Sequence, residues 1–251
     1  MYIMVKYIWV MSMIKFENVT KVYNKKVLAV DDISFRVKGG EIVGFIGPNG
    51  SGKTTTMKLL TGIIKADVGK ITVNHFNIRR DPIKAKESIG YIADSPDMFL
   101  RLKGSEFLDL MGDIYRVPER KRRERTESIC ERFDLTDALS SPIMSYSHGM
   151  RQKIMVAAAL MHNPPVWILD EPMVGLDPKS AYELKQMMRE HAKAGNAVFF
   201  STHVLEVAEK LCDRVMIIKK GKILFDGTLE NLESQNKNES LEKIFLELTE
   251  K

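Results

Sequence analysis

The sequence predicts an α/β fold with a largely parallel central sheet. Short runs rich in Val, Ile and Phe recur along the 251 residues, and several of them, such as "EIVGFIG" and "VWILD", are continuously apolar. Strands of that composition are typical of a sheet covered on both faces. Helical patterns lie between the runs, for example at residues 54–60, 179–192 and 205–211. This alternation of strands and helices indicates the α/β class.

The alternation is interrupted between about residues 95 and 146. This stretch shows no convincing strand pattern and at least two helical ones. In one of them, apolar residues recur at the spacing of a single helix face: Phe107, Leu110, Met111, Ile114 and Tyr115. We therefore expect a helical subdomain inserted into the α/β body.

Both ends of the chain fall outside the α/β pattern. Residues 1–13 are apolar and no small-residue cleavage site follows them, so we expect an extended or non-native start rather than a signal peptide. The natural start would then be Met11 or Met13; the alternatives are a short extra strand and a disordered tail. Residues 236–251 are expected to form an amphipathic helix, because four apolar residues follow helical spacing: Leu241, Ile244, Phe245 and Leu248.

The composition predicts a soluble, cytosolic protein. No apolar run approaches the roughly 20 residues of a membrane-spanning helix. Cys130 and Cys212 stand far apart and outside any Cys-x-x-Cys spacing, which argues against a zinc site or a disulfide framework. The formal net charge is +5, and its densest cluster, at residues 118–127, mixes both signs. We interpret that cluster as a solvated helix face rather than a nucleic-acid patch, and expect no nucleic-acid partner.

The strongest local motif is "GPNGSGKT" at residues 47–54, which follows an apolar strand and precedes a helical pattern. It matches the phosphate-binding pattern G-x-x-x-x-G-K-[ST]. Glycines let successive backbone N–H groups point at phosphate oxygens, and the helix N-terminus adds partial positive charge. Lys53 can neutralise the β- and γ-phosphates, and the Thr54 hydroxyl can hold Mg²⁺. A glycine-rich turn without a ligand is the alternative.

A pair of carboxylates ends the apolar run "VWILDE". Asp170 stands at the tip of a strand, where Mg²⁺ needs a second protein ligand, and Glu171 could deprotonate an attacking water. Two charges at the end of a buried strand are costly unless they have a function.

Adenine is the expected base of the nucleotide. The guanine-reading pattern of GTPases is missing, because "NKKV", which begins at Asn24, ends in valine instead of aspartate and precedes the phosphate loop. Tyr23 is the aromatic residue expected to stack on the base, and a buried core tyrosine is the alternative. The expected nucleotide-binding residues are Tyr23, Gly47, Pro48, Asn49, Gly50, Ser51, Gly52, Lys53, Thr54 and Thr55.

The order of these motifs resembles the nucleotide-binding subunit of an ABC transporter, from Ile14 to the C-terminal helix. The series consists of Tyr23, the phosphate loop at residues 47–55, a glutamine loop at Asp94, a signature at residues 146–150, Asp170-Glu171, a D-loop at residues 175–177 and a switch histidine, His203. The resemblance implies a P-loop NTPase with a RecA-like core, an N-terminal antiparallel β subdomain and the inserted helical subdomain. Residues 14–235 would then form the ATPase domain.

The sequence departs from the family pattern at two motifs. Asp94 stands where the family usually has Gln; its carboxylate can still approach Mg²⁺ through a water, or it can be a loop carboxylate without a metal contact. The signature reads Tyr-Ser-His-Gly-Met in place of Leu-Ser-Gly-Gly-Gln.

The resemblance assigns the signature to the nucleotide of the opposite subunit, through Ser147, His148, Gly149 and Met150. The Ser147 hydroxyl and the Gly149 backbone would touch its γ-phosphate, and the helix that follows would aim its N-terminus there. The adjacent Ser147 and His148 are therefore not interpreted as a hydrolase pair or a metal site, since neighbouring residues at a helix start diverge in direction.

By resemblance, the chain acts as a head-to-tail dimer with a second copy of itself or with a homologous ATPase subunit, and ATP with Mg²⁺ lies between the two. Glu171 would be the base and His203 and Lys53 the other catalytic residues, with Asp177 in the D-loop. Closure would act on a separately encoded integral membrane permease from the cytoplasmic face, with export as the expected direction. A non-transport ABC ATPase, for example in iron–sulfur assembly or translation, and a nucleotide-gated binding module with little turnover are the alternatives.

Overall fold

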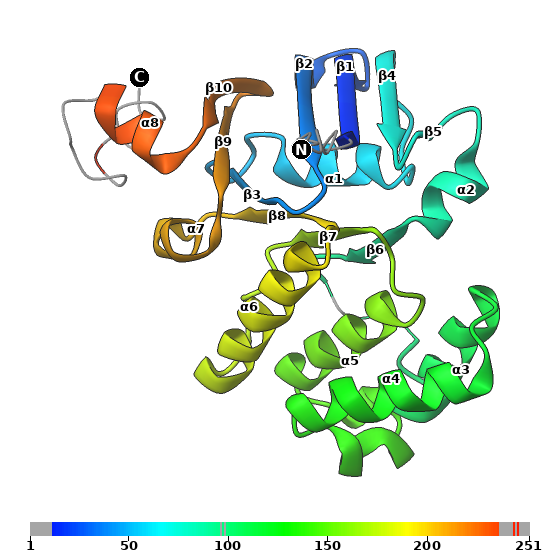
Figure 1. Cartoon of the computed structure of the whole chain (residues 1–251). Helices are drawn as coiled ribbons and strands as arrows, with labels where there is room; N and C mark the ends of the chain where they lie inside the picture. The colour runs from blue at the N-terminus through cyan, green and yellow to red at the C-terminus, as the bar shows by residue number, and fades with distance from the viewer. Residues whose placement is uncertain (1–11, 96, 98, 236–242, 244, 246–251) are drawn as a thin grey trace, which may run out of the picture.

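Two β-sheets frame the part of the chain that the computed structural model describes, residues 12–95, 97, 99–235, 243 and 245 (Figure 1). As described, the first sheet is antiparallel and follows the order β2 (Val27–Lys38), β1 (Ser12–Tyr23), β4 (Val68–Val73), β5 (Phe76–Asn77). The second sheet follows the order β10 (Lys222–Gly227), β9 (Arg214–Lys219), β3 (Ile42–Ile46), β8 (Ala197–Thr202), β7 (Val166–Asp170), β6 (Ile89–Ile92). Its strands pair in parallel except β9 with β10. The predicted α/β class and N-terminal antiparallel sheet are confirmed.

Helices precede or follow the strands of the second sheet in the sequence. They are α1 (Lys53–Leu60) after β3, α2 (Pro82–Glu87) before β6, α6 (Pro178–Lys193) between β7 and β8, α7 (Leu205–Leu211) between β8 and β9, and α8 (Leu229–Gln235) after β10. A crossover helix of this kind lets consecutive strands run in parallel. The phosphate loop is the β3–α1 connection, so both of its ends are fixed by regular structure.

A group of helices occupies the chain between β6 and β7. It contains α3 (Gly104–Ile114), α4 (Glu119–Arg132) and α5 (His148–Leu160), with 3₁₀ turns at Thr136–Ser140 and Ile143–Ser145. Figure 1 shows these helices, in green, on the side of the second sheet away from the first sheet. Phe107 and Leu108 of α3 are buried, whereas Ile114 on the predicted apolar face is the last residue of the helix and 58% exposed.

The second sheet separates two cores, which explains its continuously apolar strands. Neighbouring residues of β8 face opposite layers. Phe199 stacks on Phe35 of the first sheet with 5.6 Å between ring centroids, whereas Phe200 packs into the core shared with α5 and α6. Side chains on both faces of such a strand must be apolar.

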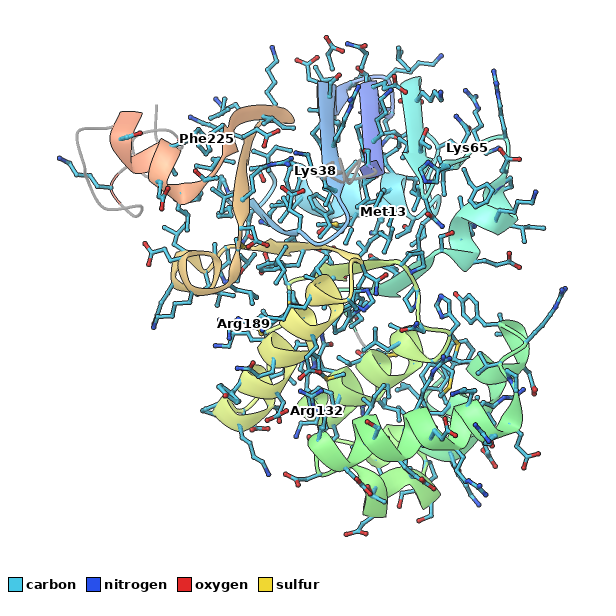
Figure 2. The ribbon with its side chains drawn as sticks, in the orientation of Figure 1. Met13, Lys38, Lys65, Arg132, Arg189 and Phe225 are labelled. Atoms are coloured by element: carbon cyan, nitrogen blue, oxygen red, sulfur yellow. The ribbon has the colours of Figure 1, made fainter. Side chains whose placement is uncertain are left out.

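Ion pairs hold the outer helices. Arg132 at the end of α4 contacts Glu183 at 3.0 Å and Glu190 at 2.7 Å, so it joins the inserted helices to α6 (Figure 2). Along α4, Arg120 and Lys121 pair with Glu124 at 3.1 and 3.2 Å, as a solvated helix face with mixed charges predicts.

Both cysteines are free thiols, as their spacing predicts. Burial raises the pKa of Cys130 to about 11, so this thiol stays protonated and unreactive at neutral pH.

The predicted non-native start and the predicted C-terminal helix fall mostly on residues outside the described ranges. These are residues 1–11 and, at the other end, 236–242, 244 and 246–251. Ser12 and Met13 are part of β1, and Phe245 packs against a small cluster that includes Leu232. Within the described ranges, no helix combines the length and the apolar character that crossing a bilayer requires.

Candidate active site

The carboxyl ends of three adjacent parallel strands bring the predicted catalytic residues to one edge of the second sheet. The pairing of β7 with β8 sets Asp170 opposite Ser201, and β3 on the other side of β8 leads into the phosphate loop. Glu171 and His203 follow β7 and β8. Ligands of open α/β sheets bind at this edge.

The phosphate loop has a backbone that only glycine fits at two positions. A Cβ at Gly47 would lie 2.3 Å from the carbonyl oxygen of Ile218, and one at Gly52 would lie 2.5 Å from that of Ala29. Gly52 also has φ +113°, a conformation that L side chains rarely adopt. The Ser51 hydroxyl is buried and has no hydrogen-bond partner among the described residues. A ligand with acceptor oxygens would satisfy it.

Lys53, the first residue of α1, lies between the phosphate loop and the carboxylates. Its Nζ donates to the carbonyl oxygen of Gly47 at 2.7 Å and lies 3.5 Å from Oε1 of Glu171. The side chain is 6% exposed, so its charge acts at short range in a weakly screened environment. This position suits neutralisation of phosphate charge at the loop.

Asp170 is fully buried and accepts a 2.5 Å hydrogen bond from the hydroxyl of Ser201 at Oδ1. Burial raises its pKa; the hydroxyls of Ser201 and Thr54 oppose this rise, and the nearby charges of Asp94 and Glu171 add to it. Oδ2 has no partner in the described structure, although it is buried. An unsatisfied carboxylate oxygen beside a threonine hydroxyl is the hard donor set that Mg²⁺ takes, so these residues fit the ion.

Glu171 and His203 are in direct contact. The His203 Nδ1 lies 3.0 Å from Oε2 of Glu171, and the backbone N–H of His203 donates to the same oxygen at 3.3 Å. Glu171 has φ +50°, an uncommon conformation for a residue with a side chain. Its backbone N–H donates to Ser201 Oγ at 2.9 Å, which holds this conformation in place. The carboxylate therefore faces the phosphate loop instead of continuing the strand.

Tyr23 and Asp94 lie at or just after the ends of two strands. Tyr23 ends β1 and is 36% exposed, which excludes the alternative of a buried core tyrosine. Lys21 Nζ lies 5.6 Å from the centroid of its ring. Asp94 is exposed just after β6, close enough for its charge to raise the pKa of Asp170.

The signature residues begin α5. Ser147 is the N-cap, and its Oγ accepts from the backbone N–H of Met150 at 3.2 Å. No hydrogen bond joins Ser147 to His148 within the described structure, so the adjacent pair does not form a hydrolase dyad. Tyr146 is buried and its hydroxyl donates to the carbonyl oxygen of Ala138 at 2.5 Å, so it belongs to the core. The exposed part of the signature therefore starts at Ser147.

The start of α5 packs against the segment after Glu171. A Cβ at Gly149 would lie 2.8 Å from the carbonyl oxygen of Gly175, and one at Gly175 would lie 2.2 Å from Cδ2 of His148. Lys153 Nζ lies 3.2 Å from Asp177. The signature and the D-loop of one chain are thus in contact with each other.

Asp177 has a structural role that its assignment to the D-loop does not include. It is the N-cap of α6, where its carboxylate accepts from the backbone N–H of Ser180 at 2.9 Å and from the Ser180 hydroxyl at 2.6 Å. These hydrogen bonds and Lys153 lower the pKa of Asp177. The motif "DPKS" signals this cap, because Asp followed by Pro at the first helical position is typical of a helix start.

One residue of the site is missing from the sequence-based prediction. Ser201 contacts both carboxylate residues. The only signal for Ser201 is its place two residues before His203 in "FFSTH".

Comparisons with known proteins identify the family of the chain. A family model described as ABC transporter matches residues 30–174. The linearmycin resistance ATP-binding protein LnrL of Bacillus subtilis is 36% identical over 220 residues, which cover 88% of this chain and 70% of that protein. The daunorubicin resistance ATP-binding protein DrrA3 of Streptomyces coeruleorubidus is 32% identical over 219 residues, 87% of this chain and 69% of that protein.

Two solved structures share the fold. An ATP-binding subunit of an ABC transporter superposes with a TM-score of 0.90 at 31% identity, over 94% of this chain and 99% of that one. A dimeric, post-hydrolysis state of the ATP-binding cassette MJ0796, bound to ADP and Pi, superposes with a TM-score of 0.78 at 25% identity, over 86% and 99% of the two chains.

Proposed function

The chain belongs to the ATP-binding subunits of ABC transporters, and we propose that two such subunits bind two ATP molecules across a head-to-tail interface to drive export through a separate permease. As a member of this family it is an ATPase that powers transport. The observation that carries the assignment of roles is the convergence of Lys53, Asp170, Glu171 and His203 at one edge of the sheet.

In the proposed site, the phosphate loop and Lys53 hold the β- and γ-phosphates. Thr54 and Asp170 hold Mg²⁺, with Asp94 contributing through a water. The ion supplies charge neutralisation at the phosphates when bound. Tyr23 stacks on adenine from the end of β1, and its exposure supports this role.

Glu171 acts as the base in hydrolysis. Its carboxylate takes a proton from water, the water oxygen bonds to the γ-phosphorus, and the bond between that phosphorus and the β–γ bridging oxygen breaks to give ADP and phosphate. His203 contacts Oε2 of the Glu171 carboxylate and orients this carboxylate toward the phosphate. The positive φ of Glu171 supports a functional role, since strained conformations concentrate at such sites.

The signature serves the nucleotide of the opposite subunit. Ser147, Gly149 and Met150 are at the exposed N-terminus of α5, whose N–H groups attract anions. The dimeric, ADP-bound and Pi-bound cassette with the same fold supports a dimer for this chain. The chain contains all the residues of both half-sites, so a homodimer is sufficient, and a homologous ATPase subunit would serve equally as the second half.

We assign the permease contact to the cavity between the body and the inserted helices. This cavity of about 360 Å³ is mostly apolar and includes Ile63, Tyr91, Phe99, Phe107 and Tyr115 in its lining. Phe99 is 43% exposed and stacks on Phe107 at 5.0 Å between centroids. An exposed aromatic ring stacked on a buried one in an apolar cavity fits the insertion of a short helix from a partner. The chain would then lie on the cytoplasmic face of the membrane.

Export is proposed because LnrL and DrrA3 are both named for resistance to a compound. The residues that contact the cargo belong to the permease.

The Glu171→Gln variant tests the catalytic assignment. It should bind ATP with little change, form a stable ATP-dependent dimer in light scattering, and hydrolyse ATP at least a hundred-fold more slowly, because a general base typically contributes about 10²–10⁴. Glu206→Gln, which changes an exposed carboxylate on α7, is the matched control and should keep full turnover. Unimpaired hydrolysis by Glu171→Gln would refute the role of Glu171.

A further inference from the structure

A second cavity lies beside the proposed permease groove and is lined by cations. It has a volume of about 370 Å³ and is enclosed by the end of α1, by β4 and β5, and by α2. Lys65, Lys70, Arg79 and Lys86 line it, and Lys86 also lines the proposed groove. The two cavities are therefore neighbours on one surface. Figure 2 shows Lys65 at this side of the molecule, near α2.

Most of the cations on this surface have no acidic partner. Lys70 contacts Glu17 at 3.7 Å. Six others have no carboxylate within ion-pair distance among the described residues: Lys58, Lys65, Arg79, Arg80, Lys84 and Lys86. Elsewhere, as on α4, basic side chains pair with nearby carboxylates. Unpaired cations in such number raise the local potential and attract an anionic partner.

The same surface exposes large apolar side chains. Ile83 of α2 is 71% exposed and Ile63 is 57% exposed. Ala85 is the buried residue of α2. The short helix thus presents Ile83 next to Lys84 and Lys86 toward solvent. A mixture of exposed aliphatic and basic residues is typical of a surface that lies in the headgroup region of a membrane.

We propose that this cationic surface, formed by residues 79–86 together with Lys65, binds the phosphate groups of anionic phospholipids in the inner leaflet beside the permease. The inference rests on the proposed function, which puts the groove next to it against the membrane protein. Each basic residue near an anionic bilayer contributes about 1 kcal/mol of binding free energy. Ile83 adds apolar contact at the level of the headgroups.

Vesicle flotation of the purified full chain tests the proposal. The chain should bind vesicles that contain phosphatidylglycerol, release them at high salt, and bind poorly to phosphatidylcholine alone. The triple variant Arg79→Ala, Arg80→Ala, Lys84→Ala should bind anionic vesicles about a hundred-fold more weakly, from three losses of about 1 kcal/mol. Ile83→Ser alone should also weaken binding, although it leaves the charge of the surface unchanged.

A charge-matched control uses α4. The variant Arg120→Ala, Lys121→Ala, Arg123→Ala removes the same net charge from another exposed surface and should bind anionic vesicles as the unchanged chain does. Equal losses in the two triple variants, or equal binding to neutral vesicles, would overturn the proposal.

Two further experiments distinguish lipid binding from binding of free phosphate and from contact with the permease. Inorganic phosphate should compete with vesicles only as strongly as chloride of equal ionic strength; specific competition would identify a site for free phosphate instead. In neutral vesicles that contain the permease, the surface variant should assemble normally; lost assembly there would assign the surface to the permease. ATP hydrolysis by the surface variant in solution should be unchanged, so this test is independent of the Glu171→Gln result.

Discussion

The hydroxyl of Ser201 donates a 2.5 Å hydrogen bond to Oδ1 of the buried Asp170. The Oγ of Ser201 in turn accepts a hydrogen bond from the backbone N–H of Glu171 at 2.9 Å. One side chain at the end of β8 therefore orients both consecutive carboxylates, one by direct contact and one through its backbone. Oδ2 of Asp170 has no hydrogen-bond partner among the described residues, and a cation would bind there.

Ser201→Ala should reduce both turnover and stability. Loss of the hydroxyl leaves a buried carboxylate oxygen and a buried N–H without a partner, which costs about 1–3 kcal/mol of unfolding free energy. Removal of a residue that orients a metal ligand typically lowers metal affinity or activity 10–100-fold. We expect a similar fall in ATP turnover and a higher Mg²⁺ requirement, measured by Mg²⁺ titration of the ATPase rate.

Ser145→Ala is the matched control for this variant. Ser145 is exposed and its hydroxyl donates only to the nearby Pro142 carbonyl oxygen. It should change neither the unfolding midpoint nor the Mg²⁺ requirement. Full activity of Ser201→Ala at low Mg²⁺ would mean that Asp170 keeps its orientation without Ser201.

Two substitutions at Asp177 separate its cap from any role at the nucleotide. Asp177→Ala removes the N-cap of α6 and should lower the unfolding free energy by about 1 kcal/mol. Asp177→Asn keeps an acceptor oxygen for the N–H of Ser180 and should retain most of this stability. Urea denaturation measures both values.

The ATPase rate of Asp177→Asn then shows whether the carboxylate also has a role at the nucleotide. A carboxylate that acts at the subunit interface cannot be replaced by a neutral amide, so turnover should fall while stability is kept. Normal turnover in Asp177→Asn would leave Asp177 with the capping role alone.

The fold was largely predictable because its signals are local. The apolar runs that became β3, β7 and β8 are continuous, and their composition alone requires cover on both faces. The phosphate loop is equally local, since spacing within eight residues determines which backbone groups face a phosphate. The residues at the strand ends follow from the parallel arrangement.

Contacts between distant segments were not predictable. The bond from Ser201 to Asp170 depends on the register of β7 with β8, which are separated by α6 in the sequence. The packing of His148 on Gly175 depends on how α5 lies against a loop 27 residues farther on, and no sequence periodicity predicts a contact over that separation. Ile114 is a residue for which the sequence pattern made a wrong prediction. Its helical spacing predicted burial, but the residue is exposed at the end of α3.

Two histidines with buried ring nitrogens predict that stability falls in mild acid. Burial lowers the pKa of His162 and of His191 to about 4 from an ordinary value of 6.5. Between these values the unfolded chain binds more protons than the folded chain, so the unfolding free energy increases with pH from about 4 to 6.5. The contribution is complete above pH 6.5 and is lost as pH falls toward 4. Urea unfolding at a series of pH values measures the slope.

Replacing both histidines tests the cause of that slope. The double variant His162→Gln, His191→Gln should show a flatter dependence over the same interval, even if its stability is lower at every pH. His75→Gln, at an exposed position, should keep the original slope. A slope that survives in the double variant would assign it to groups other than these two histidines.

The contact between His148 and Gly175 predicts a strong coupling between the signature and the D-loop. Gly175→Ala should be destabilising for two reasons, because its Cβ would lie 2.2 Å from His148 Cδ2 and because φ is +79°. In a His148→Gly background the clash disappears and only the backbone cost of about 1 kcal/mol remains. The double-mutant cycle should therefore give a coupling of about 0.5–3 kcal/mol in unfolding free energy. The ATPase rate should follow the same pattern, since Gly175 lies between Glu171 and Asp177. Additive effects would show that the histidine ring moves aside at no cost, and that the substitution in the signature is merely tolerated.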